Sequence, residues 1–172
     1  MKRRNGLLAV TATERAEALN DFFATTFTVE DTSSIPDSDG EQFTGEHLNT
    51  FEITPVKVLK KLQDLNPGKT PGLDGWHPLF LKNVADLIAE PLAILFQKSL
   101  NAGVLPEDWR KACVTAIHKK GEKNLPDNYR PVSMTSIICK LMESIVRDEI
   151  VEHMIVKDLF SKLQHGFVPH RD

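Results

Sequence analysis

Several kinds of residue are scarce in this chain, and each scarcity excludes a class of protein. Two cysteines among 172 residues are too few for a disulfide framework. No apolar run approaches the roughly 20 residues of a membrane span, and no apolar core of a secretory signal follows the basic start. We therefore expect an intracellular protein, cytoplasmic or nuclear, with no membrane partner and with Cys113 and Cys139 reduced and buried.

Positive charge is also limited. The net charge is −3, so the protein as a whole is not a basic nucleic-acid binder, and any such affinity must come from a local patch. Residues 28–50 contain no lysine or arginine but several acids and glycines. This composition predicts an acidic flexible linker over 29–50. No period of 20 to 50 residues recurs, which excludes a repeat protein.

Helical patterns occupy most of the rest of the chain. Residues 1–28 are predicted to hold an amphipathic helix, which Thr11 and Glu14 begin as a capping box. Thr54 and Pro55 are a typical helix start, a cap followed by a first-turn proline. Residues 78–102 also read as helical, and we expect Pro91 to break or kink this helix.

A strand pattern interrupts these helices at 112–133. Residues 112–117 are apolar and rich in β-branched side chains, and the segment before Pro131 is extended. A polar turn lies between them, which predicts a two-stranded ribbon. After it, Thr135 or Ser136 caps a long helix to about Ile155. The expected fold class is α+β, mostly helical with a small antiparallel β-ribbon.

The ribbon concentrates positive charge. Between residues 110 and 130 only Glu122 and Asp127 are acidic, against six cations: Arg110, Lys111, Lys119, Lys120, Lys123 and Arg130. Such a patch suits polyphosphate, because lysines act as mobile point charges and arginine as a fixed fork. The alternative is a solvated hairpin whose lysines protect a strand edge from pairing.

Other chemistry-bearing residues favour structural roles. The glycine-rich segment 66–75 lacks the order of a phosphate-binding P-loop, so we expect a shaped loop with a helix on either side. Asp74 has no second carboxylate nearby and is expected in a turn or cap rather than at a metal. Trp109 is expected to pack under the ribbon rather than to stack on a base. No Cys/His pairing has the spacing of zinc ligands.

A series of motifs in fixed order resembles one family. Trp109 precedes a strand ending in Lys-Lys-Gly, and Asn-Tyr-Arg-Pro-Val-Ser follows at 128–133. Upstream, 65–75 reads Leu-Asn-Pro-Gly-Lys-Thr-Pro-Gly-Leu-Asp-Gly; downstream stand Lys-x-x-Glu at 140–143 and Gln-x-Gly-Phe at 164–167. Together these motifs resemble the reverse transcriptases of non-LTR (LINE-type) retrotransposons over roughly residues 50 to 170.

The resemblance implies a fold and a set of contacts. Residues 51–172 would form a partial reverse-transcriptase domain, the fingers subdomain, with an N-terminal helical extension. Lys119, Lys120 and Arg130 would contact nucleotide or template phosphates, and Gln164 and Gly166 would lie near the template. The implied partners are an RNA template, a DNA primer, deoxynucleotide triphosphates and the missing palm domain.

The resemblance also implies what this chain lacks. The family holds magnesium with one aspartate and a later Asp-Asp pair, but no two aspartates are adjacent here and Asp172 lacks the family's context. We assign no catalytic or metal-binding residue and expect magnesium only in the full-length enzyme. The expectation is a fragment truncated before the palm that does not polymerise alone. The alternatives are a domesticated, non-catalytic RNA- or protein-binding module and a structural remnant.

Overall fold

The structure, a computed structural model, describes residues 1–3, 6–28, 33, 48, 50–161 and 163. Its residues form two compact units. The ribbon unit combines Met1–Thr44 with Cys113–Met134, and the helical unit combines Gly45–Ala112 with Thr135–Asp172. Gln164, Gly166 and Asp172 lie outside the described residues, as does most of the predicted linker. Within the described part, no helix has the length and apolar character that a bilayer span needs.

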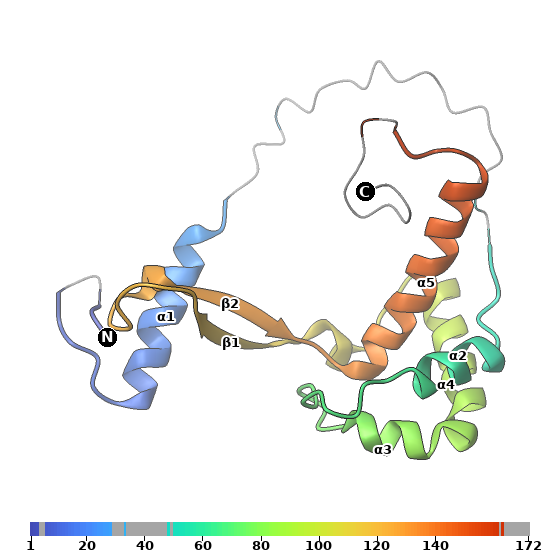
Figure 1. The fold of residues 1–172 in the computed structure, drawn as a ribbon, viewed down its shortest axis with the longest axis horizontal. Helices are drawn as coiled ribbons and strands as arrows, with labels where there is room; N and C mark the ends of the chain where they lie inside the picture. Colours follow the sequence, from blue (N-terminus) through green and yellow to red (C-terminus); the bar gives the residue numbers. More distant parts are fainter. Residues whose placement is uncertain (4–5, 29–32, 34–47, 49, 162, 164–172) are drawn as a thin grey trace. The chain divides into compact units, whose positions relative to one another are not determined.

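An antiparallel hairpin forms the centre of the ribbon unit (Figure 1). Strand β1 (Cys113–His118) pairs with β2 (Tyr129–Met134) in a register that places Cys113 opposite Met134 and His118 opposite Tyr129. A short 3₁₀ turn, η2 (Pro126–Asn128), leads into β2. The predicted ribbon is therefore confirmed, and with it the mixed α+β class.

Helix α1 (Ala12–Thr26) belongs to the same unit and contacts η2. It begins as predicted: the Thr11 hydroxyl accepts from the Glu14 N–H, while the Glu14 carboxylate accepts from the Thr11 N–H at 3.0 Å. Hydrogen bonds from the backbone N–H groups of Thr11 and Val10 lower the pKa of Glu14. The cap fixes the first turn and so places the buried Phe23 on the inner face.

The helical unit is built around α2 (Pro55–Gln63), which contacts α3 (Pro78–Asn83), α4 (Ala85–Ala102) and α5 (Ile137–Val156). Thr54 caps α2 as the sequence predicts, and of the two candidates Thr135 and Ser136 it is Ser136 that caps α5. The fully buried side chains of Val58, Leu62 and Phe96 are members of one apolar core.

Pro91 was expected to break or kink the helix, and the break does not occur. The helical segment is interrupted at Val84, where α3 ends and α4 begins, and α4 continues through Pro91. Pro91 lies on the exposed face, while Ala89, Ala93 and Phe96 are buried on the other. Burial of that face holds the helix together despite the missing backbone donor.

Two residues just before or at the start of β1 also differ from expectation. Trp109 lies in the 3₁₀ turn η1 (Glu107–Arg110) and packs edge-on against Phe96, with ring centroids 5.7 Å apart. It therefore joins the core of the helical unit instead of packing under the ribbon. Cys113 is exposed rather than buried, as are Ala112 and Val114 on either side of it. Cys139 is buried as expected.

Candidate nucleic-acid interface

The hairpin displays Lys119, Lys120 and Arg130 on its surface, and all three residues are exposed. Arg130 pairs with Ile117 across the ladder, so the two side chains share one face of the ribbon. The Lys119 N–H donates to the Asn128 carbonyl at 2.7 Å, which extends the ladder by one position. Since side chains alternate along a strand, Lys119 falls on the same face as Arg130.

The turn that carries these lysines is held by several contacts. Gly121 has a φ of +80°, and a Cβ there would lie 2.7 Å from the Asn128 amide nitrogen. That amide donates to the Glu122 carbonyl at 2.9 Å, and the Tyr129 hydroxyl donates to the Lys123 carbonyl at 3.0 Å. The rings of His118 and Tyr129 meet edge to face, with centroids 5.2 Å apart. The lysines therefore project from an ordered turn.

The three cations are not neutralised by ion pairs in the described part of the chain. Among the described residues, none of Lys119, Lys120 and Arg130 takes part in a salt bridge. Exposed cations without carboxylate partners interact favourably with phosphate oxygens and release condensed counterions from a nucleic acid. The arrangement suits electrostatic contact with a phosphate chain.

The glycine-rich loop has the structural role that the sequence predicts. It connects α2 to α3, and Asp74 accepts hydrogen bonds from the Trp76 N–H at 3.3 Å and from the Ser136 hydroxyl at 2.6 Å. A Cβ at Gly72 would lie 2.5 Å from the Thr135 carbonyl oxygen, so only glycine fits there. The loop is thus fastened to the start of α5. The hydrogen bond between Ser136 and Asp74 was not predicted from the sequence, where Ser136 was recognised only as a candidate helix cap.

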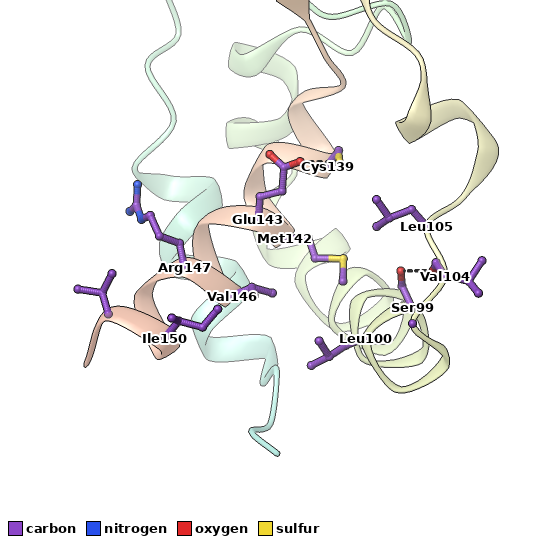
Figure 2. A pocket seen from close by; sticks show the side chains of 12 residues that line it. Ser99, Leu100, Val104, Leu105, Cys139, Met142, Glu143, Val146, Arg147 and Ile150 are labelled. Carbon is purple, nitrogen blue, oxygen red and sulfur yellow. Dashed lines mark hydrogen bonds between the residues drawn. The ribbon is translucent and has the colours of Figure 1, made fainter. Parts of the chain in front are cut away.

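The helical unit contains an apolar groove of about 480 Å³, and Figure 2 shows the side chains that line it. The end of α4 and the segment from Gly103 to Leu105 form one wall, and α5 forms the other. The α5 wall carries Met142, Val146 and Ile150 at helical spacing. This spacing is visible in the sequence, whereas the groove beside it is not.

Cys139 lies at one end of this groove and is not a reactive thiol. Its thiol donates to the Glu143 carboxylate at 3.4 Å. Burial raises the pKa of Cys139 to about 11, and the negative charge of Glu143 adds to the effect. The thiolate, which is the nucleophilic form, is therefore scarce at neutral pH.

The described residues do not fit a magnesium centre of the kind that the resemblance implies. No group of three or more His, Cys, Asp or Glu side chains gathers among them in a way that could hold a metal ion. Gln164 and Gly166, the predicted template contacts, lie outside the described residues.

Comparison with known proteins places these features in context. No protein-family model matches the chain. The chain is 27% identical over 122 residues to a probable RNA-directed DNA polymerase from transposon BS of Drosophila melanogaster. The aligned region covers 69% of this chain and 14% of that protein. The RNA-directed DNA polymerase from mobile element jockey of the same species is 28% identical over 116 residues, covering 67% of this chain and 13% of the relative.

A third relative is the putative 115 kDa protein in the type-1 retrotransposable element R1DM of D. melanogaster. It is 31% identical over 108 residues, or 61% of this chain and 10% of that protein. The resemblance to reverse transcriptases of non-LTR retrotransposons is confirmed by these matches. The chain spans about a seventh or less of the length of these curated relatives.

Proposed function

We propose that this chain is part of an RNA-directed DNA polymerase of a non-LTR retrotransposon and forms fingers that contact nucleotide or template phosphates. The observation that carries the proposal is the exposed set of Lys119, Lys120 and Arg130 on an ordered hairpin, in a stretch whose motifs resemble that family. The chain as a whole is acidic, so a local cationic surface is what attraction to nucleic acid requires.

The three residues would divide the work by their chemistry. Arg130 presents a planar fork suited to two oxygens of one phosphate, and it is held by a strand. Lys119 and Lys120 add compact charges at the turn, which follow a flexible polyanion. Catalysis needs metal-binding carboxylates, which we place elsewhere in the complete polymerase together with its magnesium. This part binds and orients, and it does not extend a primer by itself.

The variant Lys119→Ala/Lys120→Ala/Arg130→Ala tests the proposal. Its affinity for a 20-nucleotide fluorescein-labelled oligouridylate is measured by fluorescence anisotropy and compared with that of the wild type. Single-stranded contacts contribute about 0.7 each to the slope of log affinity against log salt, so the slope should fall by about 2. Arg15→Ala/Lys60→Ala/Lys98→Ala removes the same charges from exposed sites outside the cationic stretch of the ribbon and is the matched control.

Two outcomes would contradict the proposal. One is an unchanged affinity and salt slope in the ribbon variant, or equal losses in the ribbon and control variants. The other is primer extension by the isolated wild-type chain when primer–template, deoxynucleotides and magnesium are supplied. Extension would mean that sufficient metal ligands are present in this chain, contrary to our placement of catalysis elsewhere.

We further propose that the apolar groove is covered by the rest of such a polymerase. The relatives extend far beyond the matched region, and most of the side chains that line the groove are apolar. Its rim leaves Val104 64% and Ile150 42% exposed. Apolar surface of this kind, contiguous and hollowed, is typical of an interaction site rather than of a free monomer surface.

This proposal predicts the behaviour of the isolated chain. With the groove uncovered, the chain should associate non-specifically as its concentration rises, and Ile150→Glu should suppress that association by placing a charge at the rim. Ile94→Glu is the control, since Ile94 is 54% exposed and lies outside the groove lining. Sedimentation velocity measures the effect. A wild-type monomer with a sharp, reversible melt would refute the proposal, and a discrete dimer would identify a second copy as the occupant.

A further inference from the structure

A second hollow in the helical unit is lined by cations that the sequence analysis did not bring together. It has a volume of about 500 Å³ and lies between the end of α2, the loop after it and the first half of α5. Its lining contains four cations, Lys61, Lys69, Lys140 and Arg147, against a single carboxylate, Asp64. We call it the cationic pocket.

Two of the cations that line the pocket, Lys61 and Arg147, donate to the same carboxylate. Asp148 of α5 accepts from the Lys61 ammonium and, at 2.6 Å, from the Arg147 guanidinium. Partial burial raises the pKa of Asp148, but the hydrogen bonds from Lys61 and Arg147 outweigh it and the net shift is downward. Asp148 therefore stays ionised at neutral pH and holds both cations at the pocket wall while offsetting part of their charge.

The other two cations carry the unbalanced charge. In the described part of the structure, neither Lys69 nor Lys140 forms a salt bridge, and both residues are exposed. Lys69 comes from the loop and Lys140 from the second turn of α5, so they line the pocket from different elements. A phosphate between them would be approached by positive charge from two elements.

The loop that presents Lys69 is ordered by its own contacts. The Asn66 side-chain oxygen accepts from the Gly68 N–H at 2.9 Å, and the Lys69 N–H donates to the Asn66 carbonyl at 3.3 Å. Further along, the close approach of Gly72 to Thr135 fastens the loop to α5. Little loop ordering is therefore left to occur on binding, which favours affinity.

We infer that the cationic pocket is a second phosphate-binding site, one that holds the backbone of a polynucleotide. The described lining has no aromatic ring on which a base could stack, so it suits the phosphate chain and not base recognition. The Thr70 hydroxyl lies in the lining as a neutral donor beside the cations. The nature of the ligand rests on the proposed function, whereas the site is separate from the ribbon.

The variant Lys69→Ala/Lys140→Ala tests this inference with the same labelled oligouridylate. We expect the salt slope to fall by about 1.4, from two lost contacts at about 0.7 each, and the affinity at low salt to fall by several fold. Lys60→Ala/Lys98→Ala is the matched control, because both lysines are exposed, neither lines the pocket and neither belongs to the ribbon. Thermal melts should coincide, since the substituted side chains are exposed. A slope and affinity equal to those of the control would overturn the inference.

Lysine acetylation followed by mass spectrometry separates this site from the ribbon. Oligouridylate should protect Lys69 and Lys140, and leave Lys98 as reactive as in the free protein. If the pocket lysines are protected while the ribbon variant binds normally, the ribbon assignment fails and the pocket stands. If only Lys119 and Lys120 are protected, the pocket inference fails. Equal protection by inorganic triphosphate at the same phosphate concentration would replace the polynucleotide with a nucleotide and overturn the backbone assignment.

Discussion

Phe96→Ala is expected to lower the free energy of unfolding of the helical unit by about 3–5 kcal/mol. Phe96 is fully buried in α4, where it belongs to the same core as Leu62 and meets the Trp109 ring edge-on. Truncation loses the burial of the ring and leaves a cavity. Trp109 cannot readily fill it, because η1 and the strand that follows fix its backbone.

The measurement benefits from where the tryptophans lie. Both of them, Trp76 and Trp109, are in the helical unit, so urea unfolding followed by tryptophan fluorescence reports that unit. Leu87→Ala is the control, since Leu87 is on the same helix and 79% exposed, and its effect should stay within about 0.5 kcal/mol. If Phe96→Ala is too unstable to purify, Phe96→Leu should show a smaller loss. Equal stabilities of either Phe96 variant and the control would contradict the assigned core.

Much of the secondary structure could be predicted because its signals are local. Thr11 with Glu14, Thr54 with Pro55 and Ser136 each satisfy the first backbone donors of a helix within a few residues. The hairpin is equally local, since its strands are joined by a short polar turn. For the same reason, Lys119, Lys120 and Arg130 could be gathered into one candidate surface from the sequence.

The cationic pocket could not be predicted in this way. Lys61 and Lys69 come from one end of the unit's sequence and Lys140 from the other, and the ribbon segment separates them along the chain. Nothing in the period of α2 or α5 states that these charged positions face a common hollow. In the sequence, Lys140 stands out only as part of the Lys-x-x-Glu motif, whose Glu143 accepts from the Cys139 thiol in the structure.

Tertiary packing also explains the error at Trp109. This residue is adjacent in sequence to the ribbon, but its ring is part of the core around Phe96. The boundary between the two units falls between Ala112 and Cys113, inside residues 51–172, which the resemblance assigns to a single domain. Contacts that join distant segments decide such assignments, and they leave no pattern in a short window of sequence.

Pro91→Ala is expected to stabilise the helical unit by about 2–3 kcal/mol. An interior proline is roughly 3 kcal/mol less favourable in a helix than alanine, since it lacks a donor and crowds the preceding turn. Pro91 is exposed, so its replacement removes no core contact. The penalty is therefore carried at present by the packing of Ala89, Ala93 and Phe96.

The control for this substitution is Pro55→Ala in α2. Pro55 is also exposed, but it occupies the first turn of its helix, where the backbone N–H has no helical partner in any case. Its replacement should leave stability unchanged or slightly reduced, measured by the same urea titration. If Pro91→Ala instead destabilises the unit, α4 depends on the proline for its shape, and packing did not override an unfavourable residue. A gain confined to Pro91 would show that burial of one helix face outweighs the local signal from which the break was predicted.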